Sequence, residues 1–343
     1  MSHPKHANFF INQASFLRCV LPLAKEANKR NYKINFFVES SKKYNDIMIS
    51  KNMKTLLKYA QMYNADVRNS SEAKLEDTNG VSFFVENVML NKCNPKDKKI
   101  VVTTMTDFSG RYKKYIENVD HVIFPSKKYA EIYNALSEKN MYFGMPKYDV
   151  IEEINSNRNE IFKKYNIDSN NKNALFFYPR LRDERKIDIN KIIEILRKNE
   201  YNVIVKSRGK DRPNNIKLGD LYYEDISYHP HTSLELLSIC DLVVNFSSTC
   251  IKESIMFKKP IINYHIKPFE KPLAPLYNFN FAIELAENLN NHNQYAVDEK
   301  LLHNAIKTIE NQAEFKFEKC IDEYLFKHGK VSEKIFDKIE EKT

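Results

Sequence analysis

The stretch "CDLVVNFSSTCIKESIMFKKPIINYH" (residues 240–265) decides the fold. It contains an apolar run at 242–244, hydroxyl side chains at 247–249, a short helical pattern that carries Glu253, and a second apolar run at 260–262. Apolar runs separated by a helical pattern are typical of parallel strands joined by a crossover helix. The stretch therefore predicts a strand–helix–strand unit of a parallel sheet, with the hydroxyl groups at the carboxyl end of its first strand.

The same alternation extends over most of the chain. Strands are predicted at 33–38, 81–85, 99–104, 121–125 and 141–144 in the first half, and at 173–178, 202–207, 241–246 and 260–265 in the second. Helices are predicted between them at 16–31, 127–136, 188–199, 232–240 and 250–257. The pattern predicts an α/β protein with two Rossmann-like parallel-sheet domains that face each other across a cleft.

Length and composition favour two domains. The chain has 343 residues with 42% hydrophobic and 12% aromatic content, as expected of a globular protein too long for a single ordinary core. We expect an N-terminal domain at 1–150, a polar linker at 151–172, a C-terminal domain at 173–320 and a charged helical tail at 321–343. The sequence leaves open whether the tail packs on the first domain or contacts a membrane.

The formal net charge of +9 comes mostly from lysines scattered along the chain. Scattered lysines suit weakly bound anionic partners, but no motif supports nucleic-acid binding, and none is expected. The five cysteines are widely spaced without a CxxC pair, so neither a zinc site nor a disulfide framework is predicted. No apolar run approaches the roughly 20 residues that span a bilayer. We therefore expect a cytoplasmic protein, with peripheral contact at the inner membrane face left open.

The hydroxyl groups after the strand at 241–246 are the first candidate ligands. A helix N-terminus offers unpaired N–H groups and a partial positive charge, which bind phosphate oxygens. Ordinary capping needs just one Ser or Thr. In a capping box the acidic residue lies three residues after the cap, and Glu253 is not at that spacing from Ser248 or Thr249. A ligand is therefore the favoured explanation over a solvated surface glutamate. The residues predicted to bind it are Ser247, Ser248, Thr249 and Glu253.

Basic residues follow two other predicted strands. Arg180 and Arg182 come after the strand at 173–178, and Lys206 lies at the end of the strand at 202–207. The carboxyl ends of parallel strands share one edge of a sheet, where ligands of open α/β sheets bind. Because Arg and Lys both suit phosphate, the sequence predicts a pocket for a diphosphate at this edge.

The loop "SYHPH" before the helix at 232–240 carries His229 and His231. These histidines have too few partners for a metal site, so none is predicted. Because the loop lies on the expected ligand side, both are candidate nucleotide-contacting residues, with histidines that have no binding role as the alternative. Thr232 with Glu235 three residues later fits a capping box, so we expect Glu235 to be structural.

The stretch "DLVVNFSSTCIKESIMFKKPIINY" (241–264) resembles the C-terminal signature of GT-B glycosyltransferases, and "YFGMPKYD" (142–149) resembles the GxPRxD element that closes their N-terminal domain. The nearest versions occur in CDP-glycerol glycerophosphotransferases of the teichoic-acid type and in capsule sugar transferases. Non-hydrolysing UDP-N-acetylglucosamine 2-epimerases share the fold. The similarity is clear from about 141 to 265. It implies a transferase that uses a nucleotide-activated donor and needs no metal or other cofactor.

The resemblance also implies roles for the candidate residues. The hydroxyl groups at 247–249 would bind the donor diphosphate, Glu253 the ribose hydroxyls, and the backbone of 228–231 would lie beside the base. Arg180, Arg182 and Lys206 would meet phosphate. The general base of such enzymes lies in the N-terminal domain, which makes Asp107 and His6 the candidates. Two family motifs differ here: no His-Gly pair occurs in the first domain, and "VKSRGK" replaces a segment that ends in His-Pro.

Because of these differences, the leading hypothesis is transfer of a sugar from a nucleotide donor to a glycan or lipid-linked acceptor of the cell envelope or capsule. The alternatives are a CDP-glycerol glycerophosphotransferase, a UDP-sugar 2-epimerase of the same fold, and a protein that binds nucleotide or glycan without catalysis. The donor base, the transferred group and the acceptor are not specified by the sequence.

Overall fold

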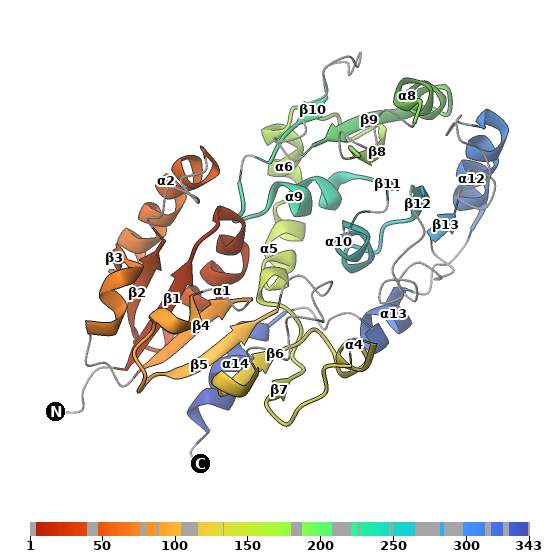
Figure 1. Ribbon diagram of the computed structural model, residues 1–343. Coiled ribbons are helices and arrows are strands. Elements are labelled where there is room, and N and C mark those ends of the chain that lie inside the picture. Colours follow the sequence, from red (N-terminus) through yellow and green to blue (C-terminus); the bar gives the residue numbers. More distant parts are fainter. Residues whose placement is uncertain are drawn as a thin grey trace. The chain divides into compact units, whose positions relative to one another are not determined.

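A computed structural model of the chain contains two compact units (Figure 1). It describes residues 5–39, 47–75, 80–86, 89–103, 116–132, 134–179, 187–207, 221–225, 227–246, 248, 250–264, 282–284, 298–312, 317–324 and 329–341. Unit 1 comprises Met1–Glu152, Ser227–Pro230 and Glu323–Thr343, and unit 2 comprises Glu153–Ile226 and His231–Asp322. The range 151–172, expected as a linker, contains the helices α5 (Ile151–Ser156) and α6 (Arg158–Lys164).

Unit 1 is built on a seven-stranded sheet with the order β3-β2-β1-β4-β5-β6-β7. All neighbouring strands pair in parallel. The strands are β1 (His6–Ile11), β2 (Lys33–Val38), β3 (Asp66–Asn69), β4 (Val81–Val85), β5 (Lys98–Val102), β6 (His121–Ile123) and β7 (Asn140–Met141). Its helices include α1 (Leu17–Lys29), α2 (Ile47–Met62), α4 (Lys127–Ile132) and α14 (Val331–Glu340).

Aromatic side chains build the core of unit 1. Phe9 of β1 lies between Phe36 of β2 and Phe83 of β4, with ring centroids 5.7 and 5.1 Å apart. Leu21 of α1 and Ile335 of α14 belong to the same buried cluster. The strands are apolar on both faces because both faces of the sheet are covered, as is usual for parallel sheets.

Unit 2 repeats this plan with a sheet in the order β10-β9-β8-β11-β12-β13, again with parallel pairs throughout. The strands are β8 (Lys172–Phe177), β9 (Tyr201–Lys206), β10 (Tyr222–Tyr223), β11 (Leu242–Phe246), β12 (Ile261–Tyr264) and β13 (Ala282–Glu284). The other helices are α8 (Ile189–Lys198), α9 (Thr232–Ile239), α10 (Cys250–Met256), α12 (Glu299–Asn311) and α13 (Phe317–Tyr324). The α/β class and the parallel sheets predicted from sequence are thereby confirmed.

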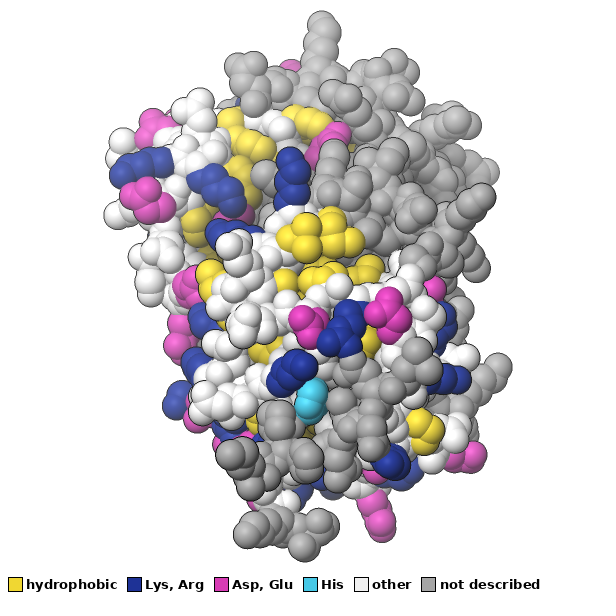
Figure 2. All heavy atoms as spheres, turned by 90° about the vertical axis from the view of Figure 1, so that its left-hand side faces the viewer, with side chains coloured by type: hydrophobic (Ala, Val, Ile, Leu, Met, Phe, Trp, Pro, Cys, Tyr) yellow, Lys and Arg dark blue, Asp and Glu magenta, His cyan; other side chains and the backbone are white. Residues whose placement is uncertain are grey.

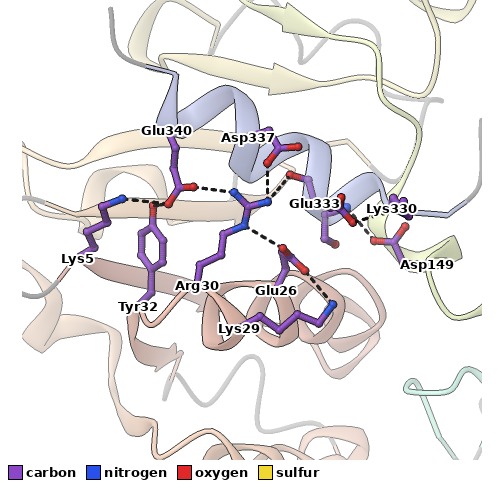
Figure 3. Close-up of polar contacts among 11 residues, drawn as sticks. Lys5, Glu26, Lys29, Arg30, Tyr32, Asp149, Lys330, Glu333, Asp337 and Glu340 are labelled. Atoms are coloured by element: carbon purple, nitrogen blue, oxygen red, sulfur yellow. Dashed lines mark hydrogen bonds and ion pairs between the residues drawn. The ribbon is translucent and has the colours of Figure 1, made fainter.

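Helix α14, near the end of the chain, packs on unit 1, which is one of the two arrangements left open for the tail. Helix α14 begins where Asp149 accepts hydrogen bonds from the backbone N–H groups of Val331 and Ser332, at 2.8 and 2.9 Å. Farther along the helix, the guanidinium of Arg30, the residue that follows α1, lies among carboxylates of α14 (Figure 3). Asp149 belongs to the "YFGMPKYD" segment, so this motif binds the first residues of α14.

One strand near the start of the chain was not predicted. The first strand predicted from sequence is 33–38, whereas the structure also forms β1 from His6 to Ile11. The strand contains a buried Asn8, a residue type that is depleted in strands. Its amide donates to Asp97 at 2.8 Å and accepts from Asn35 at 2.8 Å, so burial does not leave it unpaired.

The surface shown in Figure 2 mixes basic side chains with acidic ones, and apolar side chains lie among them. Within the described ranges, the helices are too short or too polar for any of them to cross a membrane. The same ranges hold no cluster of histidine, cysteine and carboxylate side chains suited to a metal ion.

Candidate functional site

The strand order of unit 2 reverses between β8 and β11. These two strands pair directly, with Val243 opposite Leu175. In open α/β sheets such a reversal opens a crevice at the carboxyl ends of the strands, where ligands bind. The chain leaves β8 toward Arg180 and leaves β11 toward the hydroxyl segment 247–249. The strand ends that precede these motifs are therefore neighbours at the reversal.

Ser248 is the second residue after β11 and is partly buried. Its Oγ accepts from the backbone N–H of Cys250 at 3.4 Å, so it takes part in capping α10. Asn245, fully buried in β11, donates from its side-chain amide to the backbone oxygen of Ser248 at 3.2 Å and to Oδ1 of Asn263 at 2.7 Å. Asn245 thus fixes the backbone at Ser248.

Glu253 is buried, with 8% of its surface exposed. This burial excludes the solvated surface glutamate that was the alternative to a ligand-binding role. Its neighbour Lys252 is 4% exposed. Burying an ionised side chain is costly unless it is paired, so a charged residue in this place has a specific partner or purpose.

At the end of β9, Lys206 is also buried, and it is paired within unit 2. Its Nζ lies 2.7 Å from Oδ1 of Asp225, and the two side chains are 5% and 8% exposed. Nε2 of His231 lies 3.2 Å from the same oxygen. Burial alone would raise the pKa of Asp225, but the charge of Lys206 and the contact with His231 hold that pKa well below its usual range.

His229 belongs to unit 1 together with the rest of Ser227–Pro230. Its ring lies edge-on to Tyr59 of α2, with the centroids 5.2 Å apart. Burial lowers the pKa of His229 to about 4, and the charge of Lys25 acts in the same direction. His229 and His231 are therefore separated in the fold: His231 joins the Asp225 cluster of unit 2, and His229 packs in unit 1.

The capping box predicted at Thr232 does not form. Helix α9 begins at Thr232 with His231 as its N-cap, and no side chain makes the capping hydrogen bond. Glu235 instead accepts from Lys164 at 2.7 Å and from the hydroxyl of Tyr165 at 2.6 Å. Glu235 has a structural role as expected, but it joins α9 to α6 rather than closing the start of its own helix.

His6, one of the two proposed bases, lies at the amino end of β1. This end of the strand is opposite the carboxyl edge at which ligands of such sheets bind. Burial lowers the pKa of His6, with Lys33 acting in the same direction. The position does not favour His6 as the base, and its role remains a prediction. The other predicted residues, Asp107, Arg180, Arg182, Ser247 and Thr249, lie outside the described residues.

Sequence reasoning did not find Asp225 or Asn245. Asp225 lies in "YYEDIS", which matches no motif, and its importance appears only when folding brings it to Lys206. Asn245 carried a usable signal, because a polar residue inside the apolar run 242–246 requires a buried hydrogen-bond partner.

Solved structures with the same architecture define the class of the fold. The wall teichoic acid polymerase TagF matches with 17% identity over 98% of this chain and 88% of that chain, at a TM-score of 0.62. A putative UDP-N-acetylglucosamine 2-epimerase from Listeria monocytogenes matches with 10% identity over 99% and 98%, at 0.61. MnaA of S. aureus with UDP matches with 13% identity over 98% and 96%, at 0.53. The chain has the GT-B fold, as the sequence predicted.

Residues 25–341 match the model of the family described as CDP-glycerol:poly(glycerophosphate) glycerophosphotransferase, and the chain belongs to that family. No curated protein sequence matches the chain. The match confirms the family resemblance seen in the sequence. It supports the glycerophosphotransferase alternative better than the sugar transfer that led the sequence-based hypotheses.

Proposed function

We propose that this protein transfers a glycerophosphate unit from CDP-glycerol to a hydroxyl group of a teichoic acid-like polymer of the cell envelope. The family match over residues 25–341 is the observation that carries the proposal. The neighbouring carboxyl ends of β8 and β11, with buried Glu253 in the following helix, support a donor site in unit 2. A TagF structure obtained with CDPG gives the same donor for that relative.

The reaction would form one phosphodiester bond and break one phosphoanhydride bond. The acceptor oxygen attacks the β-phosphorus of CDP-glycerol, the bond from this phosphorus to the bridging oxygen breaks, and CMP leaves with the bonding electrons. A general base takes the proton of the acceptor hydroxyl. Hydrogen-bond donors around the diphosphate stabilise the charge that develops on the leaving CMP.

The residues of the chain are assigned to these tasks as follows. The hydroxyl segment 247–249 donates to the diphosphate, and Glu253 accepts from the ribose hydroxyls. Arg180 and Arg182 bind phosphate through their planar guanidinium groups. Asp107 is the proposed base, because it follows β5 in the chain and belongs to the domain in which the resemblance places the base. No step of this scheme requires a metal ion.

The acceptor is proposed to be a glycan or a lipid-linked polymer reached from the cytoplasm, with the protein peripheral at the inner membrane face. Transfer of a sugar, the leading hypothesis from sequence, is not supported by the family match. The motif "VKSRGK" still differs from the family pattern, in which a segment ending in His-Pro is expected.

Release of CMP from CDP-glycerol, measured with and without a poly(glycerophosphate) acceptor primer, tests the proposal. We expect acceptor-dependent CMP release together with elongation of the primer. A parallel panel should contain CDP-ribitol, UDP-glucose and UDP-N-acetylglucosamine. Turnover of a UDP-sugar with no reaction of CDP-glycerol would replace the proposal by sugar transfer, and conversion of a UDP-sugar without acceptor would replace it by epimerisation.

A further inference from the structure

Three ionisable side chains from separate segments of unit 2 meet at one carboxylate oxygen. Lys206 ends β9, Asp225 follows β10, and His231 precedes α9. Oδ1 of Asp225 lies 2.7 Å from Nζ of Lys206 and 3.2 Å from Nε2 of His231. The three side chains are 5%, 8% and 9% exposed, so the cluster is almost closed to solvent.

The cluster lies at the edge of the sheet where a donor is expected. Lys206 is the last residue of β9, and β9 pairs with β8, one of the two strands at which the order reverses. The cluster is therefore one strand away from the reversal and on its carboxyl side. Both Lys206 and His231 were predicted from sequence to contact the nucleotide, and Asp225 is the residue that joins them.

Stability alone explains the cluster poorly. A buried ion pair contributes little net free energy, because the cost of removing both charges from water offsets their attraction. The second neighbour of this oxygen, His231, is not needed to balance charge, because Lys206 already balances the charge of Asp225. A shared carboxylate does, however, hold an imidazole ring in one orientation, and a side chain held in its bound geometry loses less entropy when a ligand arrives.

We propose that Asp225 is a positioning residue of the donor site, which orients the imidazole of His231 toward the bound nucleotide. Lys206 serves this arrangement by balancing the charge of Asp225. The inference rests on the proposed function, because the nucleotide is its ligand. Asp225 itself makes no contact with the nucleotide and takes no part in bond making.

Calorimetric titration of CDP into the full chain tests this role. Asp225→Asn keeps the size of the side chain and removes the charge that lies beside both Lys206 and His231. We expect the Kd for CDP to rise about tenfold, the size typical of coupling between contacting residues. His231→Gln should raise it similarly, and the double variant should be no weaker than His231→Gln alone, because Asp225 acts only through His231.

Glu235→Gln is the matched control. Glu235 is also a buried carboxylate of unit 2 with a lysine partner, since it accepts from Lys164 at 2.7 Å. Its replacement should lower the melting temperature as Asp225→Asn does and leave the Kd for CDP unchanged. If Asp225→Asn does not fold, the double variant Lys206→Met with Asp225→Leu removes both charges together and should show the same loss of CDP affinity.

Two results would overturn the inference. One is a variant without Asp225 that binds CDP as tightly as the wild type. The other is an additive effect of Asp225→Asn and His231→Gln, which would mean that the two residues act separately. Failure of the wild-type chain to bind both CDP and CDP-glycerol would instead remove the proposed function, and this inference with it.

Discussion

Nη1 of Arg30, the residue that follows α1, lies 2.7 Å from a carboxylate oxygen of Glu340 on α14 (Figure 3). The same guanidinium contacts Glu26 at 2.9 Å and Asp337 at 2.6 Å. Arg30 is 19% exposed, so these charge-assisted bonds are partly shielded from water. A residue near the start of the chain thereby fixes its last helix on unit 1.

Arg30→Ala should weaken the attachment of α14. The change leaves Glu340 and Asp337 without their shared partner, and we expect the free energy of local opening of α14 to fall by about 2–3 kcal/mol. Amide hydrogen exchange within Val331–Glu340 measures this quantity. Lys163→Ala is the control, because the Lys163–Glu160 pair is 74% and 71% exposed and should change stability by less than about 0.5 kcal/mol. Equal effects of the two changes would contradict the prediction.

Asp149 should give unit 1 a stability that declines with rising pH. Burial raises the pKa of Asp149 above its ordinary 3.8, although hydrogen bonds from Ser332 and Val331 act in the other direction. Because the pKa of Asp149 is higher in the folded state, its protonation stabilises unit 1. This stabilisation is complete below pH 3.8 and is lost as the pH rises through the pKa of the folded state. Asp149→Asn cannot ionise. The melting temperature of the wild type relative to this variant should therefore fall with rising pH and then level off; a constant difference would refute the assignment.

Apolar runs were sufficient to predict most strands of both sheets. The runs at 33–38 and 81–85 coincide with β2 and β4, because strands covered on both faces read as continuous apolar segments. Strand β1 (HANFFI) was missed, although its pattern resembles that of β2 (KINFFV), which was predicted. The partner that makes Asn8 acceptable is Asp97, which lies 89 positions away. No local pattern can indicate such a pairing.

The candidate site was predicted only in part, because some of its contacts join residues that are far apart in the sequence. The position of the hydroxyl segment after β11 follows from local pattern, since strand, helix and strand are contiguous in the chain. The role of Lys206 did not follow, because its partner Asp225 is recruited from beyond β10. The different surroundings of His229 and His231, two residues apart, likewise depend on which unit each one packs in.

His229 should reduce stability under mildly acidic conditions. Burial lowers its pKa to about 4 from an ordinary value of 6.5. Because the folded pKa is the lower one, the contribution of the neutral ring is complete above pH 6.5 and is lost as the pH falls toward 4, to a total of about 3 kcal/mol. His229→Phe keeps a ring beside Tyr59 and should remove this loss.

Chemical denaturation of the wild type and of His229→Phe between pH 4 and pH 6.5 measures the difference. His303→Phe, on the exposed surface of α12, controls for the loss of an imidazole that is not buried. The prediction fails if the stabilities of the wild type and of His229→Phe run parallel over this range.

Glu253→Gln should weaken nucleotide binding by about tenfold to a hundredfold, because a hydrogen bond to a charged group contributes about 1.5–3 kcal/mol. Ser254→Ala is the matched control on the same helix: Ser254 is fully buried and donates to the backbone oxygen of Cys250 at 2.9 Å, so its loss should not change the affinity. Calorimetry with CDP and with 2′-deoxy-CDP then locates the contact. If Glu253 accepts from the ribose 2′-hydroxyl, the wild type should prefer CDP, and Glu253→Ala, which has no side-chain acceptor, should bind both ligands alike. A preference for CDP that survives in Glu253→Ala would show that Glu253 does not bind that hydroxyl.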